Sequence, residues 1–179
     1  STLDRSSAAS DVYKIQVFFL PSTLKPGWGQ ETRAQLIAQA DYMKGQDAVI
    51  LNELFDNPAA AILLDGLKRE YPHQTPVLGR SRSGWDATQG AYAETTPEDG
   101  GVAIVSRWPI VERIQYVYAQ GCGADYLSNK GFVYVRLDRN GQPLHVIGTH
   151  AQAADTGCPD GKGTACLLYT SDAADERSS

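Results

Sequence analysis

The pattern of apolar and polar residues predicts a mixed α/β domain between residues 12 and 149. Strict alternation indicates strands, whereas an apolar spacing of three to four residues indicates amphipathic helices. The continuous apolar run 48–51 is typical of a strand covered on both faces. The predicted strands are 12–20, 48–51, 101–106, 114–119, 131–137 and 144–149, and the predicted helices are 32–44 and 59–71.

The faces of these elements follow from the same pattern. The buried face of strand 12–20 is expected to carry Tyr13, Ile15, Val17 and Phe19. The buried face of helix 32–44 is expected to carry Leu36, Ile37, Ala40 and Met43. Asn140-Gly141 predicts a tight hairpin between the last two strands. Strands that alternate with helices early and pair by hairpin later predict a mixed sheet with helices on its outer side.

Charge and composition narrow the function classes. The chain of 179 residues carries a net charge of −5 and no run of Lys and Arg, which argues against a nucleic-acid partner held by phosphate contacts. No segment reaches the roughly 18 to 20 continuous apolar residues of a membrane span. Residues 1–11 are polar and Ser-rich and are predicted to be a disordered leader. The sequence shows no apolar export signal near its N-terminus. We therefore expect any such signal to have been removed or left out of this sequence.

The end of the sequence matches a known sequencing artefact. Residues 166–176 read CLLYTSDAADE, which matches one translation frame of a common transposase-based sequencing adapter. We therefore expect segment 166–179 to be foreign and the natural protein to continue differently after about Ala165. Setting Cys166 aside leaves Cys122 and Cys158, which on the residues alone are either a disulfide or two free thiols.

Candidate chemical groups follow two predicted strands. Glu53 comes shortly after strand 48–51 and His150 directly after strand 144–149, where a rigid strand can hold a side chain at a cleft. Glu98-Asp99 lies in a glycine-flanked turn, and Asp125 lies near Cys122. A hard cation such as Mg²⁺ takes one or two carboxylates plus water and phosphate oxygens. Each group also has an ordinary structural explanation, so the residues alone indicate only a possible divalent-metal hydrolase.

Longer segments carry a more specific signal. These are GWGQETRA (27–34), DAVILNELFDN (47–57), TPEDGGVAIVS (96–106), GCG (121–123), LSNKGFVY (127–134) and HVIGTHAQA (145–153). Together they resemble the bacterial neutral sphingomyelinases, in the same order and with similar spacing, over residues 12–158.

This resemblance implies a fold and a function. The fold would be the four-layer α-β-β-α sandwich of deoxyribonuclease-like enzymes in the endonuclease/exonuclease/phosphatase group, with residues 12–165 forming roughly its first half. The parent protein would be a secreted, extracellular phosphodiesterase that uses Mg²⁺ or another divalent cation. It would act as a monomer on sphingomyelin in a membrane surface and release ceramide and phosphocholine.

The resemblance also implies roles for individual residues. Glu53 would be the central Mg²⁺ ligand, His150 would contact the scissile phosphate, and Asp125 would assist the leaving group. A second cation site at the edge of the cleft would be formed by Asn57, Glu98 and Asp99, and the family's disulfide by Cys122 and Cys158.

Two features depart from the family pattern. Gln16 occupies a position on the first strand where the family has an active-site Asn. The family's Asp/Asn metal pair and its C-terminal catalytic His, the general base, have no counterpart before residue 166. We therefore expect the chain as given to be inactive and poorly soluble. A nuclease of the same fold and a catalytically dead binding or toxin-like relative are the alternative interpretations of the parent protein.

Overall fold

The computed structural model describes residues 10–119 and 127–150. The helical elements are α1 (Gln30–Gln39), the 3₁₀ turn η1 (Asp41–Met43) and α2 (Asn57–Leu67). The strands are β1 (Val12–Phe19), β2 (Ala48–Leu54), β3 (His73–Gln74), β4 (Ala87–Gly90), β5 (Ala103–Ser106), β6 (Ile110–Val117), β7 (Gly131–Arg139) and β8 (Gln142–Thr149). In this part of the chain no helix is long and apolar enough to cross a membrane.

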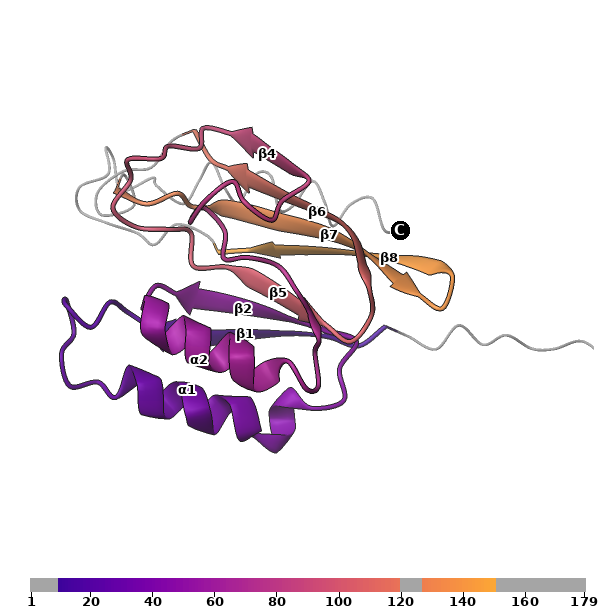
Figure 1. Ribbon diagram of the computed structural model, residues 1–179, viewed down its shortest axis with the longest axis horizontal. Coiled ribbons are helices and arrows are strands. Elements are labelled where there is room, and N and C mark those ends of the chain that lie inside the picture. The colour runs from indigo at the N-terminus through magenta and orange to yellow at the C-terminus, as the bar shows by residue number, and fades with distance from the viewer. Residues whose placement is uncertain (1–9, 120–126, 151–179) are drawn as a thin grey trace, which may run out of the picture.

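The strands form two sheets that lie face to face (Figure 1). The first sheet has the order β1-β2-β5-β3, with β1 parallel to β2 and the other pairs antiparallel. The second has the order β4-β6-β7-β8, in which only the β4–β6 pair is parallel. Helices α1 and α2 cover the outer face of the first sheet (Figure 1). The described residues therefore form three layers, helix, sheet and sheet, of the predicted sandwich.

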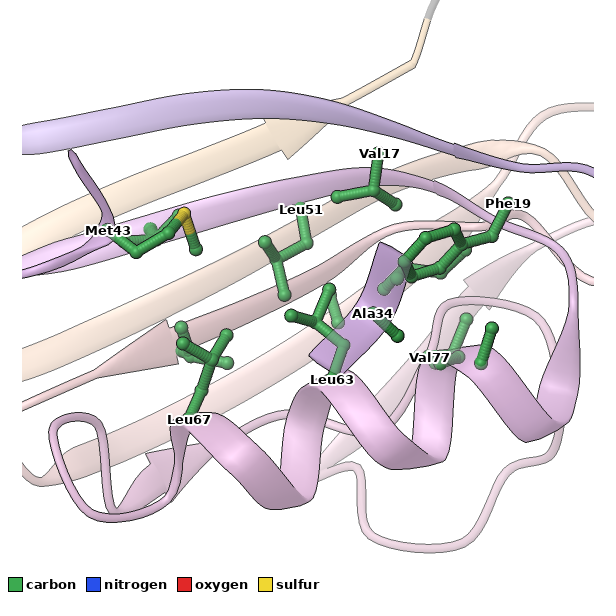
Figure 2. Close-up of a cluster of buried hydrophobic side chains, with 14 of the residues drawn as sticks. Val17, Phe19, Ala34, Met43, Leu51, Leu63, Leu67 and Val77 are labelled. Carbon is green, nitrogen blue, oxygen red and sulfur yellow. The ribbon is translucent and has the colours of Figure 1, made fainter. Parts of the chain in front are cut away.

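One hydrophobic core lies between the helices and the first sheet. Figure 2 shows Leu63 and Leu67 rising from one face of α2 toward Leu51 of β2. All three side chains are fully or almost fully buried. The Asp56 carboxylate starts α2 by accepting a hydrogen bond from the Ala59 N–H at 3.1 Å, as an N-cap residue does.

A second core fills the space between the two sheets. Along β7 the buried residues alternate with partly exposed ones, so that Val133, Val135 and Leu137 face the first sheet. Gly148 of β8 lies against Ile50 of β2, where a Cβ atom would come within 2.7 Å of the isoleucine Cγ2. Glycine at this position lets β8 approach β2 closely. The ends of these two strands carry Glu53 and His150.

Several sequence predictions are confirmed by these elements. Strand β2 is buried along nearly its whole length, and the Asn140-Gly141 turn joins β7 to β8 with positive φ at both residues. Val17 and Phe19 are buried as predicted. Strands β5 to β8 all overlap the predicted strands.

Other predictions are wrong in detail. The helix predicted over 32–44 ends at Gln39, because Ala40 is extended, and a separate 3₁₀ turn then buries Met43. Leu36, placed on the buried face, is 65% exposed. Helix α2 begins and ends earlier than the predicted 59–71. Asp11, placed in the leader, accepts backbone hydrogen bonds from Asp47 and Ala48 and belongs to the fold.

A candidate active site between the two sheets

Glu53 stands at the end of β2 on an unusual backbone. Its φ of 65° lies in the left-handed region, which is rare for a residue with a side chain and is often found at functional sites. The next residue, Leu54, donates its N–H to the Gly101 carbonyl at 2.9 Å. Gly101 in turn donates its N–H to Asp99 Oδ1 at 2.9 Å. The acidic turn thus fixes the backbone that presents Glu53.

His150 reaches Glu53 from the other sheet. Its Nε2 lies 3.6 Å from Glu53 Oε1, and the two side chains are 13% and 14% exposed. The ring of Phe55 meets the imidazole edge to face, with the centroids 6.4 Å apart. The two residues predicted from strand ends are therefore brought together, although they are almost a hundred positions apart in sequence.

The charge of Glu53 is poorly compensated by the protein. Burial raises the pKa of Glu53, and the nearby Lys130 ammonium opposes that rise only in part. Lys130 also lies over the Phe55 ring, with its Nζ 5.8 Å from the centroid. A largely buried carboxylate with a raised pKa is the kind of group that a bound cation stabilises. The donor set therefore fits a single-carboxylate Mg²⁺ site of the predicted kind.

Gln16 lies beside this pair on the first sheet. The parallel register of β1 and β2 sets Gln16 opposite Asn52, the residue before Glu53. Gln16 is exposed, whereas Asn52 is fully buried. The position that the resemblance assigned to the active site is therefore adjacent to Glu53 in space.

The predicted edge site is organised by an arginine. Arg80 donates from Nε to Asp99 Oδ2 at 3.0 Å and from Nη2 to Asn57 Oδ1 at 2.7 Å. Because the other Asp99 oxygen accepts the Gly101 N–H, both carboxylate oxygens already have donors. The structure thus brings Asn57 and Asp99 together around the Arg80 guanidinium. In this arrangement the Arg80 guanidinium is the cation beside Asp99, and the second divalent-cation site stays a prediction.

The two acidic residues of the turn both have a raised pKa. Burial raises the pKa of Asp99, with Arg80 acting against the rise. Burial also raises the pKa of Glu98, and the neighbouring Asp99 charge adds to the effect. The Arg80 guanidinium opposes both rises in pKa but does not cancel them.

Three predicted residues, Asp125, Cys122 and Cys158, lie outside the described residues. Within residues 10–119 and 127–150, no group of three or more His, Cys, Asp or Glu side chains is close enough together to hold a metal ion. A cation held by Glu53 would therefore need further ligands beyond such a cluster, such as water and phosphate oxygens.

Sequence reasoning missed four residues of this region: Asn52, Phe55, Arg80 and Lys130. Three of them lie inside the segments that carry the resemblance, so the signal was present without an assigned role. Arg80 lies in a loop and has no periodic or motif signal. Only its contacts with Asn57 and Asp99 reveal it.

Comparison with known proteins identifies the family of the chain. The sequence model described as the endonuclease/exonuclease/phosphatase family matches residues 16–168. The chain belongs to the endonuclease/exonuclease/phosphatase family. Sphingomyelinase C from Bacillus cereus is 58% identical over 159 residues, which cover 87% of this chain and 48% of that protein. Phospholipase C from Staphylococcus aureus is 57% identical over 145 residues, 81% of this chain and 44% of that protein.

Solved structures of this family show the same fold. A beta toxin variant from Staphylococcus aureus with bound magnesium ions matches with a TM-score of 0.86 at 48% identity, covering 95% of this chain and 61% of that one. Sphingomyelinase C from Streptomyces griseocarneus matches with a TM-score of 0.81 at 47% identity, covering 90% and 58%. The predicted deoxyribonuclease-like sandwich is confirmed. The chain spans about half the length of the curated relatives it matches.

Proposed function

We propose that the full-length protein is a divalent-metal-dependent phosphodiesterase that hydrolyses sphingomyelin to ceramide and phosphocholine. The observation that carries the proposal is the meeting of Glu53 and His150, at 3.6 Å, at the ends of two strands from different sheets. Both residues lie in segments that resemble bacterial sphingomyelinases, and the similarity to sphingomyelinase C extends over 87% of the chain. That similarity supports sphingomyelin as the substrate.

Magnesium is the cofactor that the site and the relatives favour. Glu53 would hold the ion, because burial raises its pKa and leaves its charge in need of a partner. The beta toxin variant of similar fold was crystallised with magnesium ions. Bound Mg²⁺ would stabilise negative charge on the phosphoryl oxygens during hydrolysis. Other divalent ions that accept oxygen ligands, such as Mn²⁺ and Co²⁺, would be able to substitute.

Two of the described side chains, His150 and Lys130, would add a hydrogen-bond donor and a positive charge to the site. His150, held between the Phe55 ring edge and Glu53, would donate a hydrogen bond to a phosphate oxygen. Lys130 adds a positive charge close enough to influence Glu53. Positioned donors of this kind act most strongly where charge develops in the transition state. The role of Asp125 at the leaving group remains a prediction from the resemblance.

The test is phosphocholine release by the full-length protein. Sphingomyelin liposomes with Mg²⁺ should yield phosphocholine, EDTA should stop the reaction, and His150→Ala should reduce the rate by about 10² or more. Phosphatidylglycerol liposomes and plasmid DNA serve as alternative substrates. Cleavage of DNA in the absence of sphingomyelin hydrolysis would favour a nuclease. Metal-independent lipid binding with no hydrolysis would favour the alternative of a catalytically dead relative. The replacement of the family's Asn by Gln16 is the feature that suggests this alternative.

We also propose that the protein is exported and acts as a monomer outside the cell. The glycine-rich, polar sequence around Cys122 and Cys158 supports a disulfide, and disulfides persist in oxidising compartments. The absence of a basic run in the sequence supports a lipid rather than a nucleic-acid partner.

A further inference from the structure

Asn52 connects the two strands that carry the catalytic pair. Its Nδ2 donates a hydrogen bond to the Thr149 carbonyl oxygen at 3.3 Å, and its side chain is fully buried. Asn52 is the residue before Glu53, and Thr149 is the residue before His150. The hydrogen bond therefore crosses from the first sheet to the second one residue before each member of the pair.

Thr149 is itself firmly held on the second sheet. Its hydroxyl donates to the Gly131 carbonyl at 3.1 Å and lies 2.9 Å from the Tyr118 hydroxyl. Just before it, Gly148 allows close contact of β8 with Ile50. Asn52 thus bonds to a backbone position that two further contacts fix. A shift of Asn52 would be passed directly to the backbone beside His150.

The other end of the Asn52 amide is unusual. Its Oδ1 is buried and has no hydrogen-bond partner among the described residues. A buried polar atom left unpaired costs roughly 1–3 kcal/mol, so an apolar side chain of similar size would be the more stable choice at this position. Buried polar groups kept at such a cost call for an explanation other than stability.

We infer that Asn52 is a positioning residue that sets the distance between Glu53 and His150 by tying β2 to the end of β8. This inference rests on the proposed phosphodiesterase function. Asn52 is too deeply buried to touch substrate, so it acts through the pair. Misplacement of a catalytic group by about 1 Å can cost about 10²-fold in rate. Loss of the tie should therefore lower kcat and leave KM nearly unchanged.

The experiment compares two buried hydrogen-bond deletions in the full-length protein. Asn52→Leu removes the cross-sheet tie with little change in size. Thr75→Val is the matched control, because it removes one buried hydrogen bond, from the Ile104 N–H to Thr75 Oγ1, elsewhere on the first sheet. Asn52→Leu should lower kcat for sphingomyelin about 10- to 100-fold with KM within about twofold. Thr75→Val should lower thermal stability and keep the wild-type kcat per folded molecule.

Wild-type activity is measured first, so that the two proposals are separated. A wild-type protein without sphingomyelin hydrolysis refutes the proposed function. An active wild type with an Asn52→Leu variant of unchanged kcat, or with a raised KM and unchanged kcat, overturns the positioning role. If Asn52→Leu does not fold, Asn52→Ala decides the question, because it removes the same donor to the Thr149 carbonyl without adding apolar bulk. A severalfold loss of kcat at constant KM supports the inference, and a wild-type kcat overturns it.

Discussion

Glu53 is subject to two opposing demands, one from folding and one from catalysis. Burial raises its pKa, so that ionisation at neutral pH weakens the folded state. The sign follows from linkage: a raised pKa gives stability below the unfolded value, and that stability is lost as pH rises through the folded value. We predict that Glu53→Gln is at least as thermally stable as the wild type in EDTA at pH 7. Its phosphodiesterase activity should fall by about 10² or more.

Magnesium provides the control for this prediction. A ligand that binds only the folded state raises the melting temperature of a protein. Mg²⁺ should therefore raise the melting temperature of the wild type and leave that of Glu53→Gln unchanged. An equal rise in both proteins would show that Glu53 is not the ligand.

Arg80 is predicted to act through the buried Asp99. Its side chain is 36% exposed and that of Asp99 is 5% exposed, so removal of Arg80 leaves a desolvated carboxylate without its cation. Because burial already raises the pKa of Asp99, the unpaired carboxylate should take up a proton more readily as pH falls and become easier to bury. We predict that Arg80→Met loses about 2 kcal/mol of unfolding free energy at pH 7 and less at pH 4. Urea unfolding at both pH values measures this.

Arg82→Met is the matched control, two residues away. Arg82 pairs with Glu94 at 3.6 Å, and the side chains are 56% and 76% exposed. Exposed ion pairs contribute about 0–1 kcal/mol, so this variant should change little at either pH. Equal losses in the two variants would contradict the role of Arg80.

The residues of the site divide clearly by how far the sequence could predict them. Glu53 and His150 could be singled out because each follows a predicted strand, and in the structure their side chains lie 3.6 Å apart. The partners of Arg80 and Asn52 could not be predicted. Their contacts join segments 19 to 97 positions apart, and such pairings depend on tertiary packing rather than on periodicity.

At the scale of elements, the strands that the sequence predicted are those with long buried apolar patterns of their own. Strand β2 and the alternating β7 carry long apolar patterns and were predicted. Strands β3 and β4 have two and four residues, include polar residues, and were missed because they are held by their neighbours rather than by their own burial. Leu36 was misplaced because α1 buries Ala34 instead, and a periodic pattern cannot tell which of two adjacent stripes faces the sheet.

Asp47 joins several elements at the opposite end of β2. It accepts hydrogen bonds from Trp108 Nε1 at 2.7 Å and from the Asp11 N–H at 3.1 Å. Arg107 and Arg139 lie within 3.5 Å of its oxygens. Burial acts to raise the pKa of Asp47, and the two hydrogen bonds and two arginines outweigh it, so the pKa is lowered.

The lowered pKa gives a stability prediction with a definite sign. Ionised Asp47 stabilises the fold above its unfolded pKa of about 3.9, and this contribution is lost as pH falls through the lower folded value. We predict that Asp47→Asn costs about 2–4 kcal/mol at pH 7, because it removes a buried charge that two arginines face. The cost should shrink toward pH 2. Urea unfolding at pH 7 and pH 2 tests this, and a pH-independent cost would contradict it.

At the scale of the whole molecule, the sequence predicted the layers but not how they meet. The helices, strands and hairpin indicated packed sheets. The four-layer α-β-β-α architecture was predicted from the family resemblance alone. The approach of β8 to β2 depends on the small volume of Gly148 against Ile50, a contact between sheets that no single-strand pattern contains. That contact brings Glu53 and His150 together.

The proposed disulfide would affect the stability of the whole molecule. A Cys122–Cys158 bridge would close a loop of 37 residues. By reducing the entropy of the unfolded chain, such a bridge would stabilise the fold by about 4 kcal/mol. We predict that peptide mapping without reduction recovers these two cysteines in one covalent species. Reduction should lower the melting temperature. Cys122→Ser and Cys158→Ser should each lower it as much as the double variant does, because either change opens the same loop. Additive losses, or two separate thiol peptides, would show that the cysteines are free and would remove the main support for export.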